Sequence, residues 1–327
     1  MNALMNRRIF GSSLLAGAGA LAVRRLCSTG YLRDRRKSRS RVAILRADSY
    51  ASPLDLTLVE GLRLFDLSLR GKTVLLKPNL VEYIPGIEVN TDPRLVGAAA
   101  SAFLALGAKS VVVGEGPGHQ RDTFLVLAES GLETELQSRR IRFVDLNRDE
   151  IREVPLQTGF TGLDRLWLPR TVLTSDIIVS MPKVKTHHWA GVTLSMKNLF
   201  GVVPGVAYGW PKNLLHWKGI DRSILDINAA VPANFVIADG IIGMEGNGPL
   251  HGSPHSLGRI VLADDPVAAD FVCTRLMGLN PLRVNHLAQA AEFLGNGTPD
   301  RIVQLAEPLS GPQQPFALLP EFAHLRI

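Results

Sequence analysis

Residues 177–188 have the sequence IIVSMPKVKTHH. A short apolar run, Ile177–Ser180, stops before Pro182, and a cluster of basic side chains follows at once: Lys183, Lys185, His187 and His188. Apolar runs of about four to eight residues that are bounded by turn residues are typical of strands buried on both faces of a parallel sheet. The stretch therefore predicts a buried strand whose carboxyl end carries basic groups.

Similar apolar runs recur along the chain, at Val42–Leu45, Thr73–Leu76, Ser110–Val113, Ile141–Val144, Phe235–Ala238 and Ile260–Leu262. Segments of helical period lie between or after them, at Asp55–Leu69, Pro93–Leu106, Arg121–Glu129, Asp221–Ala230, Pro266–Met277 and Pro281–Leu294. This alternation predicts an α/β fold: a mixed, mostly parallel sheet with helices on both faces, in three layers. Alternating apolar residues between Glu153 and Arg170 predict a β-hairpin insertion, and the aperiodic stretch Gly201–Lys218 predicts a long functional loop.

Polar residues follow the ends of the predicted strands: Lys77 and Asn79, Glu115, Asp145, Lys183 and Lys185, Asp239 and Asp264. In an open parallel sheet these positions share the carboxyl edge, where α/β proteins bind ligands. We therefore expect a binding site at that edge. The alternative is that exposed strand ends carry polar residues for structural reasons, such as helix capping by Asp265 before Pro266.

Lysine is rare in this chain and is concentrated in one stretch. Only nine of the 36 basic residues are lysines, and five of these lie between Lys183 and Lys218, where no arginine occurs. Unlike arginine, lysine can lose its proton when buried, bind phosphate as a point charge or form a Schiff base. We interpret the stretch as selected for ammonium chemistry. The alternative is a solvated surface loop. The aromatic residues in the same stretch argue against it: Trp189, Phe200, Trp210 and Trp217.

Composition and charge exclude several classes of protein. The chain has 327 residues, 46% of them hydrophobic, which is enough for a large core and excludes a disordered protein. Residues 1–41 hold ten bases and one acid, whereas residues 42–327 hold 26 bases and 29 acids, so the folded part is not expected to bind nucleic acid. Two cysteines, Cys27 and Cys273, are too few for a structural zinc site or an iron–sulfur cluster within this chain.

The N-terminal residues predict export. Arg7-Arg8 precedes a weakly apolar Gly/Ala-rich run, Gly11–Val23, which is the pattern of a twin-arginine signal. We expect residues 1–27 to be this signal, residues 28–41 a basic linker and residues 42–327 a single α/β domain. The protein is then periplasmic or otherwise exported, the twin-arginine machinery is a partner, and only an uncleaved signal would attach it to the inner membrane. The alternatives are an amphipathic anchor and a chance Arg-Arg pair.

Several blocks of sequence carry a resemblance to a known family: Lys77-Pro78-Asn79, Thr91-Asp92-Pro93, Gly114-Glu115-Gly116, Pro182–His187, Ser195–Gly201, His216, Asp239-Gly240, Gly246–Pro249 and Asp264-Asp265-Pro266. Over about residues 42–280 the chain resembles the uncharacterised family called domain of unknown function 362. Some relatives carry a ferredoxin-like cluster module and many are twin-arginine substrates, but this chain lacks the cysteines for a cluster. The resemblance implies no settled activity.

The residues at the carboxyl edge predict an enzyme that binds a small anionic substrate, a phosphate or a carboxylate. We expect Lys183, Lys185 and His187 to take part in the reaction, with His187 as general acid or base because its ordinary pKa lies near neutral pH. The expected substrate contacts are Lys77, Asn79, Glu115, Lys197 and Asn198. The sequence does not disclose the reaction. A non-enzymatic periplasmic ligand-binding or maturation protein, or a subunit of a redox complex, are the alternatives.

A divalent metal is a further expectation. Asp239 and Asp264 are candidate oxygen ligands for Mg²⁺ or Mn²⁺. The histidines at positions 187, 188, 216 and 251 would favour a transition metal, but no pair has the spacing of a known motif, and a structural role is the alternative for each. The cofactor is therefore left open.

Two glycine-rich loops are open to two interpretations each. Gly114–Gly118 could turn backbone N–H groups toward a phosphate, but it matches neither the Walker A nor the dinucleotide-binding pattern, and a tight turn is the simpler interpretation. Gly246–Gly252 is either a hinged lid or a long connection. The chain has no Gly-x-Ser-x-Gly motif, which argues against a serine hydrolase.

Overall fold

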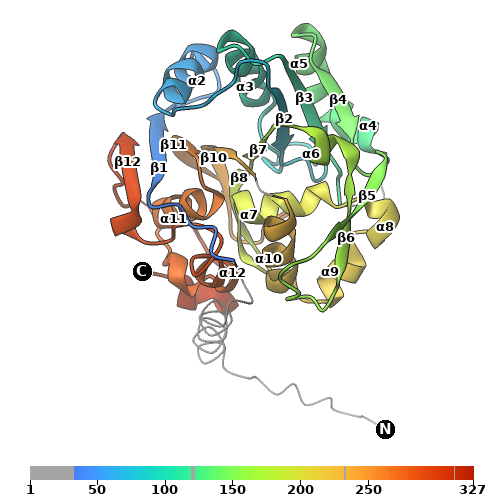
Figure 1. Ribbon diagram of the computed structural model, residues 1–327. Coiled ribbons are helices and arrows are strands. Elements are labelled where there is room, and N and C mark those ends of the chain that lie inside the picture. The colour runs from blue at the N-terminus through green and yellow to red at the C-terminus, as the bar shows by residue number, and fades with distance from the viewer. Residues whose placement is uncertain (1–32, 119–121, 232, 313) are drawn as a thin grey trace.

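The computed structural model describes residues 33–118, 122–231, 233–312 and 314–327 (Figure 1). Within these residues the main sheet has ten strands: β1 (Ser40–Arg46), β2 (Thr73–Pro78), β3 (Ser110–Glu115), β4 (Arg142–Asp145), β7 (Ile177–Met181), β8 (Lys183–His187), β9 (Gly191–Thr193), β10 (Phe235–Glu245), β11 (Ser253–Ala263) and β12 (Ile302–Ala306). Eight of them form a continuous row in the order β12-β1-β11-β10-β7-β2-β3-β4, while β8 pairs with β10 and with β9.

Most neighbouring strands of this sheet run parallel. The antiparallel pairs are those that β11 makes with β1 and β10, and the β8–β9 hairpin. In the continuous row β11 is thus the one strand that runs against the others, so its carboxyl end lies at the opposite edge of the sheet. The expectation of a mixed, mostly parallel sheet is confirmed.

Helices cover both faces of the sheet (Figure 1). One face carries α2 (Leu54–Arg63), α3 (Pro93–Ala105), α4 (Thr123–Glu129) and α5 (Leu132–Ser138). The other carries α7 (Ser195–Asn198), α10 (Ile220–Ala230), α11 (Pro266–Leu276) and α12 (Asn285–Ala290). Each face has its own apolar core; on the first, Phe235 of β10 meets the edge of Phe65 at a centroid distance of 4.8 Å. The three-layer α/β architecture is confirmed.

The predicted hairpin also forms. Strands β5 (Ile151–Pro155) and β6 (Arg165–Pro169) pair antiparallel as a separate two-stranded sheet, followed by the short helix α6 (Arg170–Thr174). Leu166 and Leu168 of β6 are buried in the core of the second face. The turn of this hairpin is held by Asp226 of α10, whose carboxylate accepts hydrogen bonds from Thr158 and Thr161. The insertion is therefore packed onto the domain.

Several element boundaries differ from the predictions. Helix α2 ends at Arg63, before the predicted Leu69, because Arg70 already forms a β-bridge with Ala108. The predicted helix Pro281–Leu294 is divided by the extended residue Val284 into the 3-10 turn η2 (Pro281–Arg283) and α12. The stretch predicted as a loop holds the short helices η1 (Leu199–Val202), α8 (Gly205–Tyr208) and α9 (Asn213–Trp217).

Strands β10 and β11 are longer than predicted, because each continues as the partner of the other beyond Gly240.

The N-terminal part of the fold begins in the segment predicted as a linker. Arg35 donates its backbone N–H to the carbonyl of Phe293 at 2.7 Å and its guanidinium to the carbonyl of Ala229 at 2.6 Å. Lys37 lies 3.3 Å from the carboxylate of Asp264. Residues 33–39 are therefore attached to the domain through Arg35 and Lys37, although all of them except Arg36 are exposed, and the linker role of residues 28–41 stays a prediction. The predicted signal, residues 1–27, lies outside the described residues.

Candidate functional site

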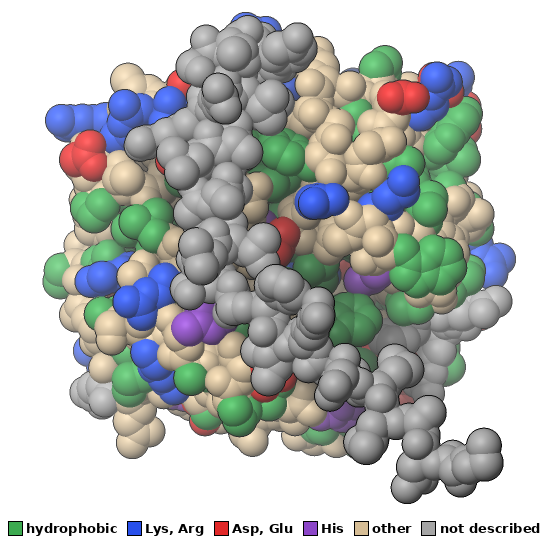
Figure 2. Space-filling view, turned by 90° about the horizontal axis from the view of Figure 1, so that it is seen from below, with side chains coloured by type: hydrophobic (Ala, Val, Ile, Leu, Met, Phe, Trp, Pro, Cys, Tyr) green, Lys and Arg blue, Asp and Glu red, His purple; other side chains and the backbone are tan. Residues whose placement is uncertain are grey.

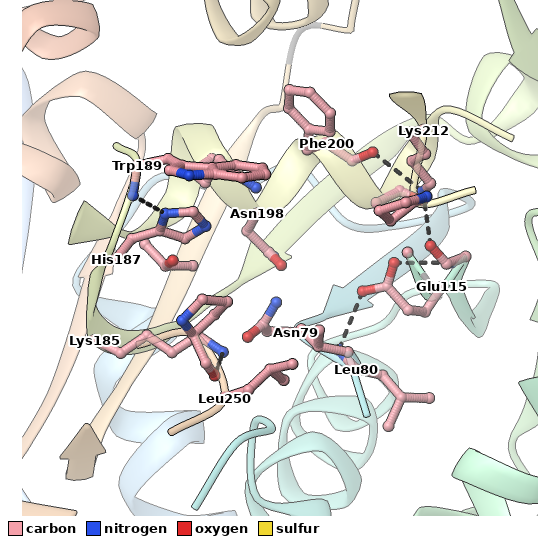
Figure 3. A pocket seen from close by; sticks show the side chains of 18 of the residues that line it. Asn79, Leu80, Glu115, Lys185, His187, Trp189, Asn198, Phe200, Lys212 and Leu250 are labelled. Carbon is pink, nitrogen blue, oxygen red and sulfur yellow. Dashed lines mark hydrogen bonds between the residues drawn. The ribbon is translucent and has the colours of Figure 1, made fainter. Parts of the chain in front are cut away.

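A cavity of about 250 Å³ lies at the carboxyl edge, where β2 and β3 end and the β8–β9 hairpin and α7 begin (Figure 3). Its polar lining comes from widely separated parts of the chain: Lys77, Asn79, Glu115, Lys185, His187, Thr193, Lys197, Asn198, Lys212 and His216. Seven of the ten residues named from the sequence line it. Lys183, Asp239 and Asp264 do not.

Lys77, Glu115 and Asn198 form a buried network on one side of the cavity. The Lys77 ammonium pairs with the Glu115 carboxylate and donates to Asn198 Oδ1 at 2.9 Å and to the Pro78 carbonyl at 3.0 Å. The Asn198 amide donates in turn to the Lys77 carbonyl. Burial lowers the pKa of Lys77, and the Glu115 carboxylate opposes that shift. All three side chains thus have their hydrogen-bonding capacity used within the protein.

Lys185 reaches the cavity from β8 without a carboxylate partner. Its ammonium donates to the carbonyls of Val89 at 2.8 Å and Pro249 at 3.4 Å. Burial, together with the charges of Lys197, Lys183 and Lys77, lowers the pKa of Lys185 well below its usual range. Such surroundings favour the uncharged amine, which has one position on Nζ left for a ligand when both of its N–H groups are bound to carbonyls.

Thr193 faces Lys185 across the β8–β9 pair. Its hydroxyl is buried and has no hydrogen-bond partner among the described residues.

Asn79 and Lys197 are the other polar residues of the cavity that the fold leaves unpaired. Figure 3 shows the Asn79 amide in the middle of the labelled side chains, and its Oδ1 is buried with no partner in the described part of the chain. The partly buried Lys197 places its ammonium 4.5 Å from the ring centre of Phe200 and makes no side-chain hydrogen bond or ion pair within these residues. Burial, aided by the charge of Lys77, lowers the pKa of Lys197 to about 8.

Three histidines line the cavity. His187 Nδ1 accepts the backbone N–H groups of Trp189 at 3.0 Å and Ala190 at 3.2 Å, so the proton of the neutral ring is on Nε2. Burial and the charge of Lys197 lower the pKa of His187 well below its usual range. His188 stacks on His187 at 4.9 Å, and His216 lies 5.4 Å from Trp189. His187 is therefore a neutral ring whose Nε2–H is a donor.

Lys212 is a cavity residue that the sequence analysis did not select. Its ammonium donates to the carbonyls of Gly116 at 2.7 Å and of Phe200 and Gly201 at 3.2 Å each. Its backbone has a φ of 66°, a conformation that lysine rarely adopts. Burial lowers the pKa of Lys212 to about 7. The lysine-rich stretch 183–218 was the signal that pointed to it; its buried position was not visible in the sequence.

Lys183 lies outside the cavity, contrary to expectation. Asp239 of β10 is its direct neighbour across the sheet and binds its ammonium at 3.0 Å. Tyr50 completes the cluster: its hydroxyl donates to Asp239 at 2.7 Å and accepts from Lys183 at 2.8 Å. Both ionic side chains have no exposed surface. Lys183 and Asp239 form a buried ion pair, so neither faces a substrate in this cavity.

The predicted metal pair Asp239 and Asp264 does not come together. Asp264 follows β11, the reversed strand, and therefore lies at the amino edge of the sheet, where its carboxylate accepts from the backbone N–H of Arg41 at 2.9 Å. Asp239 lies toward the carboxyl edge, and its carboxylate forms an ion pair with the Lys183 ammonium. Among the described residues no group of three or more His, Cys, Asp or Glu side chains is arranged to hold a metal ion.

The two glycine-rich loops have distinct roles. The backbone N–H of Gly116 is bound to the Glu115 carboxylate at 2.8 Å, which supports the tight-turn interpretation of Gly114–Gly118. Gly246–Gly252 connects β10 to β11 and brings Pro249 and Leu250 to the cavity wall (Figure 3).

On the face in Figure 2, outside the grey residues, Lys and Arg side chains are scattered and interspersed with Asp and Glu. No helix in the described ranges is long and apolar enough to cross a bilayer.

The fold and the cavity define an α/β protein with a lysine-lined pocket at the carboxyl edge of its sheet. The model of the family described as Domain of unknown function (DUF362) matches residues 74–275, and the chain belongs to this family. The matched range is shorter than the one expected from the sequence blocks. The chain is 33% identical over 285 residues to a thylakoid-associated protein of Synechocystis sp., covering 84% of each chain.

Two solved structures are more distantly similar. One is a protein of Thermotoga maritima, with 13% identity and a TM-score of 0.35, matched over 66% of this chain and 56% of that chain. The other is the lactate racemase apoprotein of Thermoanaerobacterium thermosaccharolyticum, with 13% identity and a TM-score of 0.38, matched over 68% and 54%. The chain thus spans little more than half of either structure, and similarity of this extent carries no information about the reaction.

Proposed function

We propose that this member of the family is an enzyme that binds a small anionic substrate in the cavity at the carboxyl edge of the sheet. One observation carries the proposal: an unpaired ammonium group, that of Lys197, faces a cavity that also contains two buried polar groups without partners, on Asn79 and Thr193. Buried polar groups are nearly always hydrogen-bonded, and exceptions call for a missing ligand or water. An anion that also carries a hydrogen-bond donor would satisfy all three groups, because its charge can pair with the Lys197 ammonium, its oxygens can accept from the Thr193 hydroxyl and its donor can bind Asn79 Oδ1.

Two further residues supply the means of moving a proton. Lys185 is an amine whose lowered pKa favours the uncharged form, with a lone pair that can accept a proton, and His187 presents Nε2–H as a donor. We assign Lys185 the role of general base and His187 that of general acid. Lys77, Glu115 and Asn198 position the cavity wall through their mutual hydrogen bonds.

A thermal-shift screen of phosphates and carboxylates tests the binding site. Lys197→Met keeps most of the apolar stem and removes the charge, so affinity for a stabilising anion should fall ten- to a hundredfold, about 1.5–3 kcal/mol. Lys218→Met is the matched control, because Lys218 is an exposed lysine of the same stretch. Equal stabilisation of wild type and Lys197→Met by every anion would show that Lys197 is not a contact.

Turnover separates an enzyme from a binding protein or a redox subunit. A bound anion incubated with the protein in D₂O should exchange hydrogen for deuterium or form a product, detected by proton NMR. The Lys185→Met variant should bind the anion and leave it unchanged. Binding without any chemical change in wild type would favour a non-enzymatic ligand-binding or maturation protein.

We also propose that the protein is exported by the twin-arginine route, on the pattern around Arg7-Arg8 and on the thylakoid association in the name of the Synechocystis relative. Replacing both arginines by lysine should retain the folded protein in the cytoplasm. Normal recovery of this double variant outside the cytoplasm would contradict the proposal.

A further inference from the structure

Not every lysine that lines the cavity can offer its positive charge to a ligand. The Lys77 ammonium is neutralised by Glu115 and also donates to Asn198 and to a carbonyl. The three N–H groups of Lys212 are matched by three carbonyl oxygens. An ammonium has three donors, so neither group has one left for a ligand. These two lysines hold the walls of the cavity together.

Among the lysines that line the cavity in the described part of the chain, one ammonium remains free to pair with an anion. Lys197 contacts the face of Phe200 and has no ion pair or hydrogen bond from its side chain within the described residues. Lys185, the other lysine without a carboxylate, already donates to two carbonyls and resists protonation in its buried position. The lysines of the described cavity lining therefore offer one positive charge to a ligand, which favours a ligand with a single negative charge.

Four backbone N–H groups next to the cavity, in the described part of the chain, are not available to a phosphate. Phosphate sites commonly use free N–H groups of a glycine-rich turn or a helix start. Here the N–H groups of Leu80 and Gly116 are bound to Glu115, and those of Ser195 and Met196 at the start of α7 are bound to Asp270. Among the described residues these donors are occupied, which favours a monoanion over a phosphate dianion.

The other residues of the cavity indicate the chemical nature of the uncharged part of the ligand. Its wall includes apolar side chains from four segments: Leu80, Trp189, Phe200, Pro211 and Leu250. Asn79 and Thr193 lie buried in the same cavity and need a hydrogen-bonding partner. A ligand with an apolar body and a second polar group matches both features.

We infer that the substrate is an organic monocarboxylate with an apolar or aromatic body and a second hydrogen-bonding group, its carboxylate on Lys197 and its second group on Asn79 and Thr193. This inference rests on the proposed function and narrows it from small anions in general to one class. It assigns Asn79 and Thr193 a part in selecting the substrate and Lys197 a part in binding its charge.

Calorimetric titration of the full chain with five probes tests the class. The probes are phenylacetate, para-hydroxyphenylacetate, the neutral phenylacetamide, acetate and inorganic phosphate. We expect the two aryl carboxylates to bind at least about tenfold more tightly than acetate or phosphate. Their rings can pack against the apolar side chains of the cavity wall, whereas acetate and phosphate have no ring. Phenylacetamide should bind about tenfold or more weakly than phenylacetate, because it lacks the charge.

Two variants assign the contacts. Lys197→Met should abolish the preference for phenylacetate over phenylacetamide, whereas Lys218→Met should preserve it. Asn79→Ala should weaken para-hydroxyphenylacetate more than phenylacetate. Circular dichroism checks each fold, and Lys197→Gln replaces Lys197→Met if the latter fails to fold.

The outcomes distinguish the inference from the proposed function. Phosphate binding as tightly as the aryl carboxylates would overturn the monocarboxylate class, and acetate binding as tightly would overturn the apolar body. In either case, dependence on Lys197 would leave the anion site intact. Binding of all probes that is indifferent to Lys197, or no binding of any probe, would overturn both.

Discussion

Lys183 and Lys185 lie two positions apart on β8, and both side chains are fully buried, yet their surroundings differ. Across the sheet from Lys183 stands Asp239, and the two form an ion pair; the corresponding neighbour of Lys185 is Met244, and its ammonium meets only carbonyls. The residue on the adjacent strand decides whether a buried lysine on β8 has a carboxylate partner or meets only carbonyls. Two lysines of one motif therefore have separate roles.

The largest expected effect is a loss of stability when Lys183, the lysine of the buried ion pair, is replaced. Lys183→Met leaves the Asp239 carboxylate buried without its cation, and breaking a buried pair in this way costs about 3–5 kcal/mol. Denaturant unfolding followed by circular dichroism measures the loss. The double variant Lys183→Met, Asp239→Asn should recover much of it, and a loss below about 1 kcal/mol for the single variant would remove the distinction between the two lysines.

Lys185→Met should destabilise the protein less. No buried charge is left behind, and the cost is that of two carbonyls, on Val89 and Pro249, losing a donor, about 1–3 kcal/mol. The same unfolding experiment compares the two variants directly. A loss as large as that of Lys183→Met would mean that Lys185 is also held mainly for stability.

The pH dependence should have opposite signs for stability and for binding. The pKa of Lys197 is about 8 in the folded chain and near 10.5 when unfolded, so between these values the unfolded chain binds more protons and the stability of the ligand-free protein rises with pH. Anion binding needs the protonated amine, so affinity should fall about tenfold per pH unit above about 8. Thermal unfolding and titration at pH 7 to 10 measure both, and an affinity independent of pH would exclude Lys197 as the charged contact.

The smallest expected effect is that of Thr193→Val. The hydroxyl of Thr193 is buried without a partner, so its removal should leave the ligand-free protein unchanged or stabilise it by up to about 1 kcal/mol. If the hydroxyl binds substrate, the same change should lower affinity severalfold. A clear loss of stability would show instead that the hydroxyl has a structural partner, such as an ordered water.

The sheet and most of its strands could be predicted because their signals are local. Buried runs such as Thr73–Leu76 are apolar without interruption, and Asp92-Pro93 marks the start of α3, where the carboxylate of Asp92 caps the helix. Strand direction is not local. Nothing in the run Ile260–Leu262 indicates that β11 is antiparallel, and for that reason Asp264 was expected at the wrong edge of the sheet.

The site was only partly predictable for a related reason. The residue types at the carboxyl edge were visible in the sequence, and Asn79, Lys185, His187 and Lys197 do gather around one cavity. The pairing of charges was not visible, because Lys77 and Glu115 are 38 positions apart and Lys183 and Asp239 are 56 apart. Which lysine remains available to a ligand depends on these distant partners.

The attachment of residues 33–39 has a practical consequence for handling the protein. Lys37 and Arg35 are bound at the amino edge of the sheet, beside Asp264 and Ala229, whereas the cavity lies at the carboxyl edge. A carrier or immobilisation tag joined directly before Arg33 would therefore enter on the side of the domain away from the pocket. Ligand access could be measured on a surface to which the protein is attached through that end, without the support obstructing the pocket.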